Sequence, residues 1–229
     1  MAETVRVKIC GLRSVEAALA AAGAGADLLG FNFAPVSRRR VDPAVAREVA
    51  AALAGEAAAA EAAPGAQPRS PRPALVGIFV NQPLEQVAGL VERCALDYVQ
   101  LSGDEDAAYC RAVSEAVGAG VIKAVRLATQ REEQVARLVE EGGVALVLAD
   151  AAVVGLWGGS GQAWDWRAAA GLAARYPLLL AGGLHAGNVG AAIAAVRPFG
   201  VDVASGVETD GTTDPQKVRD FIRSAKGVT

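Results

Sequence analysis

Eight short runs rich in β-branched and other apolar residues alternate with eight alanine-rich stretches along the chain. The expected strands are Val5–Cys10, Leu28–Phe33, Leu75–Val80, Tyr98–Leu101, Val121–Val125, Ala145–Asp150, Leu178–Ala181 and Val201–Ala204. The expected helices are Ser14–Ala24, Pro43–Leu53, Leu84–Arg93, Glu105–Val117, Arg131–Glu141, Trp166–Arg175, Asn188–Val196 and Pro215–Ala225. Such alternation is typical of βα units around a parallel sheet.

The length of 229 residues decides between the parallel architectures. Eight repeats of roughly 25 residues suit a closed (β/α)₈ barrel, whose usual size is about 250 residues, better than two open sheets. We therefore predict an α/β fold in which residues 1–229 form a single (β/α)₈ TIM barrel domain with a parallel sheet.

The stretch Gly55–Pro73 interrupts this repeat with four prolines and several polar residues. Proline breaks helix interiors and is excluded from central strands, so we expect this stretch neither to continue the preceding helix nor to begin the next strand. We predict a flexible, Pro/Ala-rich surface insertion at about residues 55–73. A binding arm is the alternative, which the nearly neutral charge of the segment disfavours.

Composition excludes several classes of function. The net charge of −3 comes without a basic stripe, which argues against a nucleic-acid partner. No apolar run reaches the length of a membrane span and Met1–Val7 lacks a signal core, so we expect a cytoplasmic protein without membrane contact. The three cysteines form no CxxC pair and His185 is the one histidine, so we expect neither disulfides nor a metal site.

Two reactive side chains end predicted strands, where a barrel builds its active face. Asp150 follows the apolar run Val144–Ala149, and burial there would raise its pKa into a range useful for proton donation. A helix-cap role, or an ion pair with Lys8 or Lys123, is the alternative. Cys10 ends the first strand, and nearby cations would lower its pKa and supply a thiolate, although most free cysteines are small buried apolar residues.

Glycine-bearing turns lie at or near three strand ends, and their candidate phosphate-binding residues are Gly159, Gly161, Gly182, Gly183, Ser205 and Gly206. Glycine allows close approach of backbone N–H groups to an anion, and barrels often hold phosphate after strands seven and eight. Taken singly, each turn is ordinary chain punctuation. Their shared location favours a phosphate site.

Other residues near these turns carry weaker signals. Arg38, Arg39 and Arg40 follow the second strand, and one guanidinium there could pair with a substrate carboxylate, although composition does not select which. His185 is interpreted as part of the start of the seventh helix. The tryptophans that bracket the third turn, Trp157, Trp164 and Trp166, either pack the loop or cover a substrate.

Several segments together resemble one enzyme family, the phosphoribosylanthranilate isomerases of tryptophan biosynthesis. The segments are Lys8–Leu12, Gly30–Phe33 with Ser37 and Arg39 after it, Val76–Asn81, Val99–Asp104, Ile122–Ala124, Gly158–Gly161, Leu180–Leu184 and Val201–Glu208. The resemblance extends over nearly the whole chain. The KICG start and the DVxSGVE end are its most specific parts.

The resemblance implies an Amadori rearrangement of a phosphorylated small-molecule substrate, without cofactor or metal. We expect a monomer or a homodimer. It implies that Cys10 is the general base at C2′ and that Asp150 is the general acid at the ribose ring oxygen. It further implies that Arg39 faces the anthranilate carboxylate and that the glycine turns hold the phosphate.

Ser102 departs from the family pattern, which usually has histidine at this position, and the insertion at 55–73 is not a common family feature. Two alternatives are a barrel that acts on a different phosphosugar and a barrel that binds a phosphorylated metabolite without catalysis. Most phosphosugar epimerases of this kind need metal ligands, which His185 alone does not provide.

Overall fold

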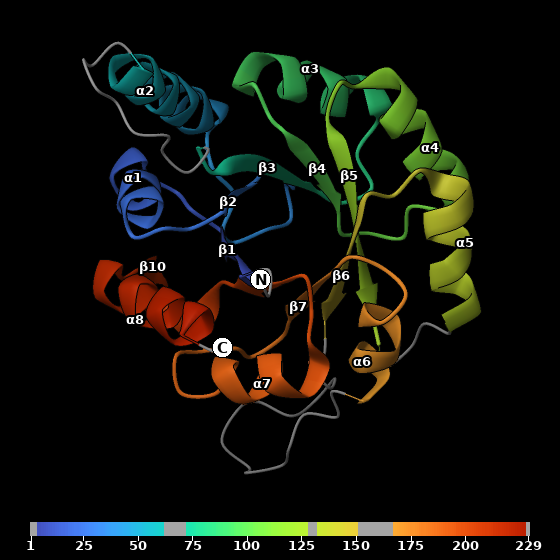
Figure 1. The fold of residues 1–229 in the computed structure, drawn as a ribbon. Helices are drawn as coiled ribbons and strands as arrows, with labels where there is room; N and C mark the ends of the chain where they lie inside the picture. Colours follow the sequence, from blue (N-terminus) through green and yellow to red (C-terminus); the bar gives the residue numbers. More distant parts are fainter. Residues whose placement is uncertain (1–3, 62–71, 128–131, 151–166, 228–229) are drawn as a thin grey trace.

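Each strand of the computed structural model pairs with its two neighbours in one closed parallel ring (Figure 1). The model describes residues 4–61, 72–127, 132–150 and 167–227. The strands are β1 (Arg6–Cys10), β2 (Leu28–Asn32), β3 (Ala74–Phe79), β4 (Tyr98–Leu101), β5 (Gly120–Arg126), β6 (Leu146–Asp150), β7 (Leu178–Ala181) and β8 (Gly200–Val203). The ring closes between β1 and β8, which confirms the predicted (β/α)₈ barrel.

The helices surround the ring on its outside (Figure 1). They are α1 (Val15–Gly23), α2 (Pro43–Glu61), α3 (Leu84–Cys94), α4 (Ala107–Ala116), α5 (Glu132–Gly142), α6 (Arg167–Ala173), α7 (Val189–Val196) and α8 (Pro215–Lys226). In the part of the chain that the structure describes, no helix combines the length and apolar character needed to cross a bilayer.

The alternating side chains of the strands divide the core into two layers. The smaller cluster fills the inside of the barrel and consists of Leu28, Val76, Ile122, Leu146, Leu148, Leu179 and Ala181. The larger cluster lies between the strands and the surrounding helices. Because consecutive strand residues face opposite sides, the strand positions that face inward near the C-terminal ends are the ones available to an active site.

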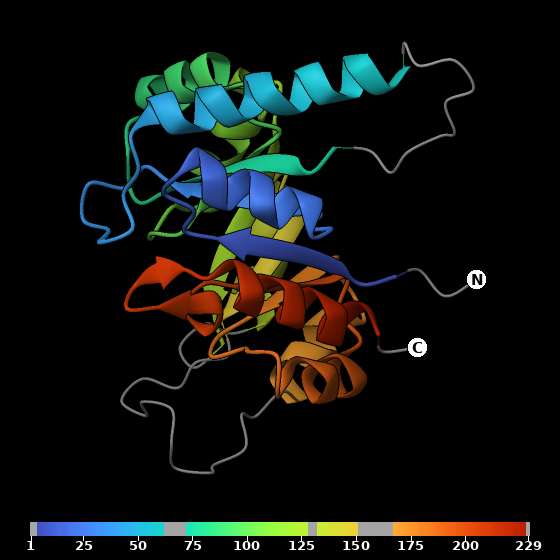
Figure 2. The same cartoon turned by 90° about the vertical axis from the view of Figure 1, so that its left-hand side faces the viewer.

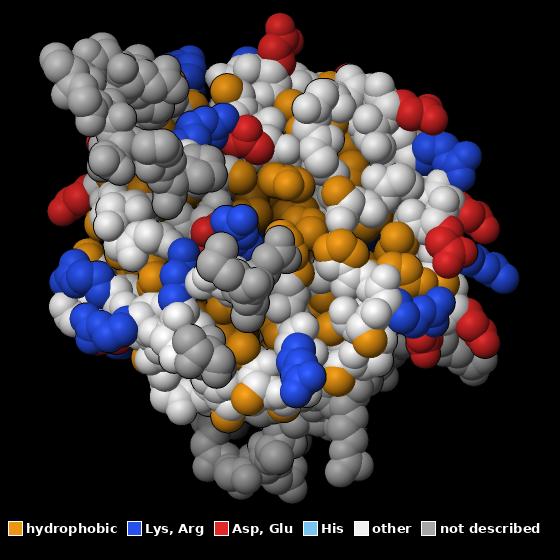
Figure 3. Space-filling view, viewed as in Figure 1, with side chains coloured by type: hydrophobic (Ala, Val, Ile, Leu, Met, Phe, Trp, Pro, Cys, Tyr) orange, Lys and Arg blue, Asp and Glu red, His pale blue; other side chains and the backbone are white. Residues whose placement is uncertain are grey.

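The two ends of the barrel differ in what they carry. Figure 2 shows both chain termini at one end of the barrel. The β1 arrow points to the opposite end, where a short hairpin of residues 208–213, drawn in red, lies. Figure 3 shows the end with the termini, with apolar side chains at its centre and charged ones toward its edge. At this end, two aspartates that directly precede strands form ion pairs. Asp27 pairs with Arg6 and Lys226, and Asp97 pairs with Arg72. In TIM barrels this end serves stability and the opposite end serves catalysis.

One predicted helix boundary is wrong. Helix α2 was expected to end at Leu53, but it continues to Glu61, so the first part of the expected insertion is helical. The prolines that would stop a helix begin at Pro64, and the intervening alanines and glutamates favour helix. Residues 62–71 of the insertion lie outside the described residues, and its flexibility stays a prediction.

A short segment after β8 was not predicted. Ser205–Val207 forms a 3₁₀ turn, and Glu208–Thr209 (β9) pairs antiparallel with Thr212–Thr213 (β10). Asp210 and Gly211 form the two-residue connection, and both have positive φ, of 51° and 72°. Such a turn matches the twist of a two-stranded hairpin.

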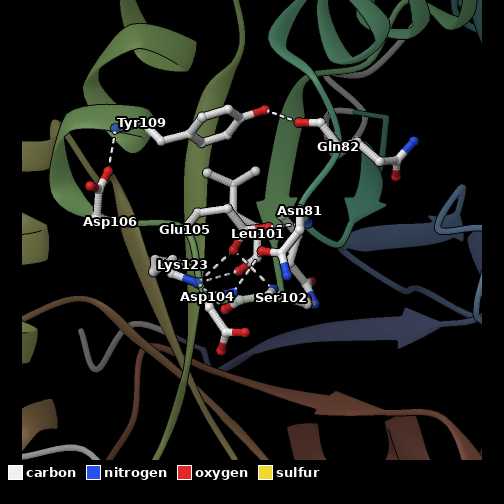
Figure 4. A network of polar contacts seen from close by, with 11 residues as sticks. Asn81, Gln82, Leu101, Ser102, Asp104, Glu105, Asp106, Tyr109 and Lys123 are labelled. Carbon is white, nitrogen blue, oxygen red and sulfur yellow. Dashed lines mark hydrogen bonds and ion pairs between the residues drawn. The ribbon is translucent and has the colours of Figure 1, made fainter.

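A buried network fixes the loop that follows β4 (Figure 4). Glu105 accepts hydrogen bonds from the backbone N–H groups of Asn81 and Gly103, at 2.8 and 2.9 Å, and from Lys123 Nζ at 2.8 Å. Lys123 also donates to the carbonyls of Gly103 and Leu101. The side chains of Lys123 and Glu105 are only 2% and 3% exposed. The network therefore joins the segments that follow β3 and β4 to Lys123 in the middle of β5.

Replacing Glu105 with Gln leaves the buried Lys123 ammonium without its anionic partner. Because loss of one partner of a buried ion pair costs about 3–5 kcal/mol, we expect Glu105→Gln to lower the free energy of unfolding in urea by that amount. The control is Glu132→Gln, which breaks an exposed pair with Arg175. An exposed pair contributes at most about 1 kcal/mol. Equal decreases in the free energy of unfolding for the two variants would therefore contradict a stabilising role of the buried pair between Glu105 and Lys123.

Candidate active site

A cavity of about 940 Å³ opens at the C-terminal ends of β4 to β8. Residues that line it include Gln100, Ser102, Arg126, Asp150, Gly183 and Ser205. Cys10 and Arg39 lie beside the cavity rather than in its lining. They are linked to it through Asp202, which lines the cavity and interacts electrostatically with Cys10. Cys10 in turn interacts with Arg39.

Cys10 is the last residue of β1 and lies next to a buried ion pair. Lys8 is fully buried two residues earlier, and its Nζ is 2.7 Å from Asp202 Oδ1 on β8. The Lys8 ammonium also interacts with the Cys10 thiol. Strand alternation places Lys8 and Cys10 on the same side of β1, so the cation faces the candidate base.

The pKa of Cys10 is raised, contrary to the sequence expectation of a lowered value. Burial is the largest cause, and the Asp202 carboxylate raises the pKa further. Lys8 and Arg39 oppose this effect but do not outweigh it. The sequence argument considered the nearby cations and omitted the desolvation and the aspartate on the last strand.

Asp150 is the last residue of β6 and lines the cavity, as the sequence predicts for a residue of the active face. The two lysines considered as its structural partners have other carboxylates: Lys8 pairs with Asp202, and Lys123 pairs with Glu105. Asp150 is aligned with Arg126 on the neighbouring strand β5, and Arg126 also lines the cavity. Since β1 and β6 are not adjacent in the ring, Cys10 and Asp150 approach the mouth from different sides.

The glycine turns after β7 and β8 lie together. Gly182 and Gly183 have positive φ, of 97° and 63°, which is the conformation that glycine adopts without strain. Gly206 has its backbone against the Leu184 carbonyl, so an added Cβ at this position would collide with the loop after β7. Ser205 lines the cavity with Gly182 and Gly183. The predicted Gly159 and Gly161 lie outside the described residues, as do Trp157, Trp164 and Trp166.

The structure distinguishes Arg39 from its neighbours. Arg38 and Arg40 are exposed, whereas Arg39 is partly buried and forms two hydrogen bonds with Glu208. Arg39 Nε is 2.6 Å from Oε1 and Nη2 is 2.7 Å from Oε2. Its side chain also crosses Gly11, where an added Cβ would lie 2.5 Å from Arg39 Cδ and where φ is +80°. The glycine of the KICG segment therefore makes room for this arginine.

Sequence reasoning assigned no role to three participants in the site. Asp202 and Glu208 hold Lys8 and Arg39, and Gln100 places a buried amide in the cavity. Gln100 Nε2 donates to Ser102 Oγ at 3.0 Å, while Gln100 Oε1 has no hydrogen-bond partner among the described residues. A polar residue inside an apolar strand was the available signal for Asp202 and Gln100, because such groups are buried only where partners exist.

His185 lies in the turn before α7, just outside the helix start where the sequence interpretation placed it. Its carbonyl accepts hydrogen bonds from the N–H groups of Asn188 and Val189. Its Nδ1 accepts one from the Gly187 N–H at 3.1 Å. The imidazole therefore contributes to the turn before α7.

Comparison with known proteins gives one consistent family. Residues 7–224 match the family model of N-(5'-phosphoribosyl)anthranilate (PRA) isomerase. The chain is 44% identical over 224 residues to N-(5'-phosphoribosyl)anthranilate isomerase of Roseiflexus sp. (strain RS-1), covering 98% of this chain and 99% of the relative.

Two solved structures agree with the sequence match. One is a phosphoribosyl anthranilate isomerase in complex with reduced 1-(o-carboxyphenylamino)-1-deoxyribulose 5-phosphate, at 34% identity and a TM-score of 0.75. The other is described as monomers generated from the dimeric enzyme of Thermotoga maritima, at 33% identity and a TM-score of 0.74. Each comparison covers 97% of this chain and 99% of the other.

The raised pKa of Cys10 predicts the pH dependence of its alkylation. A raised pKa means less thiolate at neutral pH, so the rate with iodoacetamide should rise through a midpoint above that of an exposed thiol. Asp202→Asn removes a charge that raises the pKa and should move the midpoint down, and Lys8→Met should move it up. Mass spectrometry of the Cys10 peptide measures the rate.

The control for these two variants is Asp220→Asn, which removes an exposed carboxylate on α8 and should leave the midpoint unchanged. Cys94 and Cys110 are buried in the helical layer, and burial raises the Cys110 pKa to about 11, so Cys10 should react first. Shifts of the same sign for Asp202→Asn and Lys8→Met would contradict this electrostatic account.

Proposed function

The chain belongs to the N-(5'-phosphoribosyl)anthranilate isomerase family, and from this premise we propose how its residues perform the reaction. The enzyme is an isomerase of tryptophan biosynthesis. It converts N-(5-phosphoribosyl)anthranilate into 1-(2-carboxyphenylamino)-1-deoxyribulose 5-phosphate by an Amadori rearrangement. The observation that supports our residue assignment best is a thiol and a carboxylate that reach one barrel mouth from non-adjacent strands.

The first step opens the ribose ring. Asp150, in its protonated form, donates a proton to the ring oxygen as the bond between C1′ and that oxygen breaks. The lone pair of the anthranilate nitrogen forms a C=N bond to C1′, which gives a protonated Schiff base. The position of Asp150 in the lining of the cavity supports its assignment as the general acid for a sugar bound there.

The second step moves a proton from carbon. The Cys10 thiolate removes the C2′ proton, and the electron pair of that C–H bond forms a C1′=C2′ double bond as the nitrogen regains its lone pair. The resulting enolamine takes a proton at C1′, and its C2′ hydroxyl loses a proton as the C2′=O bond of the ketone product forms. The protons gained at the ring oxygen and at C1′ equal those lost from C2′ and from its hydroxyl, so the reaction is a net isomerisation and its steps need no redox partner.

Lys8 stabilises the thiolate form of Cys10, although Cys10 is removed from water. Burial lowers the pKa of Lys8, but Asp202 and Cys10 together raise it above its ordinary value, so the ammonium stays charged. This fixed cation stabilises the thiolate more than the neutral thiol. Asp202 holds Lys8 in place, but its negative charge raises the pKa of Cys10 and so disfavours the thiolate. The free energy needed to form the thiolate therefore depends on both Lys8 and Asp202.

The substrate's two anionic groups are assigned to the two sides of the mouth. We assign the phosphate to the turns after β7 and β8, through Gly182, Gly183, Ser205 and Gly206, and to Gly159 and Gly161, which precede α6 in the sequence. Positive-φ glycines at cavity-lining positions support this assignment. We assign the anthranilate carboxylate to Arg39, which is the partly buried member of the arginine run.

Three further features belong to the same proposal. We propose that the barrel is a single domain and that the enzyme acts in the cytoplasm, where a biosynthetic isomerase meets its phosphorylated substrate. The relative from Thermotoga maritima is described as dimeric, which supports a homodimer over a monomer.

Loss of either proton-transfer group should reduce turnover strongly. A positioned proton transfer contributes about 10²- to 10⁴-fold, so Cys10→Ser and Asp150→Asn should each lower kcat by that factor, with KM changed far less. The decrease of anthranilate fluorescence as substrate is consumed measures the rate. Cys94→Ser, in α3, is the matched control and should keep kcat. Near-full turnover of a folded Cys10→Ser enzyme would refute the base assignment.

The arginine run gives a second test with built-in controls. Arg39→Ala should reduce kcat/KM by the equivalent of about 1.5–3 kcal/mol, the usual contribution of a hydrogen bond to a charged group. Arg38→Ala and Arg40→Ala remove exposed side chains and should have little effect. The same fluorescence assay measures all three. A large loss for Arg38→Ala or Arg40→Ala with none for Arg39→Ala would place the carboxylate elsewhere.

A further inference from the structure

We propose that Glu208 is a positioning residue for substrate specificity: it holds the Arg39 guanidinium so that the remaining donors face the substrate carboxylate. The inference rests on the proposed carboxylate role of Arg39. Glu208 comes from the hairpin after β8, and Arg39 comes from the loop after β2. Their contact joins two loops whose residues are 169 positions apart in sequence.

The geometry of the pair leaves three of the five Arg39 N–H donors available. A guanidinium carries five N–H donors in a rigid planar fork. Glu208 takes the side edge, with one bond from Nε and one from Nη2. Both Nη1 donors and the second Nη2 donor remain at the end of the fork, without hydrogen-bond partners among the described residues. This free edge matches a second carboxylate in bidentate geometry.

Both members of the pair are anchored before any substrate binds. The Arg39 N–H donates to Ser37 Oγ at 3.1 Å, and the Arg39 side chain crosses Gly11, next to Cys10. The Glu208 carbonyl accepts from Lys217 Nζ at 2.7 Å on α8. A free arginine would lose rotamer entropy on binding a ligand, whereas one fixed in advance loses less. The pair therefore aligns Arg39 before the carboxylate arrives.

The local charge also favours a second anion. Glu208 interacts with Arg13 and Arg38 in addition to Arg39, so one carboxylate stands among three guanidinium groups. The hydrogen bonds from Arg39 are the main reason that the pKa of Glu208 lies below its ordinary value, which keeps Glu208 anionic. An excess of positive charge remains after the pair forms. Glu208 thus orients Arg39 without cancelling the attraction for a substrate carboxylate.

The alternative is that Glu208 competes with the substrate for Arg39, and the two ideas predict opposite signs. The test compares N-(5-phosphoribosyl)anthranilate with N-(5-phosphoribosyl)aniline, which lacks the carboxylate. We expect Glu208→Gln to raise KM for the anthranilate substrate by about 10- to 100-fold, the effect of misplacing a binding group by about 1 Å. The aniline substrate should show little change in KM, and kcat should change less than KM for both.

The control is Arg72→Gln, which breaks an exposed pair with Asp97 before β4, at the opposite end of the barrel, and should leave both KM values unchanged. A lower KM for anthranilate in Glu208→Gln would show competition and overturn the inference. Equal increases for both substrates would show a merely structural role and also overturn it. If Arg39→Ala leaves the ratio of the two KM values as it is in the wild-type enzyme, Arg39 does not bind the carboxylate. The inference about Glu208 then fails as well.

A measurement on the wild-type enzyme covers the case in which Glu208→Gln does not fold. The Arg39 Nε–H resonance in NMR should be protected from exchange in the free enzyme, because Glu208 accepts this hydrogen bond. On addition of reduced 1-(o-carboxyphenylamino)-1-deoxyribulose 5-phosphate, we expect the protection to persist while the Nη resonances shift. Loss of Nε–H protection on binding would show that the ligand displaces Glu208.

Discussion

The ion pair between Lys8 and Asp202 is the interaction on which both the fold and the chemistry depend. The two residues are aligned in register across the β1–β8 pairing, where the barrel closes. Lys8 is fully buried, so the carboxylate is needed to hold the ammonium in the interior. The same ammonium faces Cys10, and its charge opposes the desolvation of a thiolate there. Closure of the barrel thus holds the Lys8 ammonium in a fixed position next to Cys10, the candidate base.

Two other ion pairs fix the loops around the mouth of the barrel. The pair of Lys123 and Glu105 fixes the loop after β4, and the pair of Arg39 and Glu208 joins the loops after β2 and β8. Each pair is partly or fully removed from water, so each constrains geometry more than an exposed pair would. Cys10 ends β1 and Asp150 ends β6 at the same mouth, and the proton-transfer roles proposed for them require a substrate held in one orientation.

The sequence predicts the barrel well because its signals are local. Every boundary of the eight barrel strands lies within one residue of the expected position, since each of these strands is a short apolar run. The end of α2 was missed because the segment was judged by its prolines, which begin only at Pro64, after residues that favour helix. The hairpin after β8 was missed because two-residue strands carry almost no periodicity.

The site is predictable in location and less so in its electrostatics. The rule that strand ends form the active face places Asp150, Gly182, Gly183 and Ser205 correctly at one cavity. The direction of the Cys10 pKa depends on burial and on Asp202, which is 192 residues away in sequence and invisible to local reasoning. The partner of Arg39 is hidden for the same reason, because Glu208 reaches it only once the barrel has closed.

The assignment of separate proton-transfer roles to Cys10 and Asp150 is tested most directly by a primary isotope effect on kcat with substrate deuterated at C2′. In Cys10→Ser, removal of the C2′ proton should limit turnover, so the account predicts a full isotope effect. In Asp150→Asn, ring opening should limit turnover, so the isotope effect should fall toward unity. A full isotope effect in Asp150→Asn together with none in Cys10→Ser would contradict the assignment.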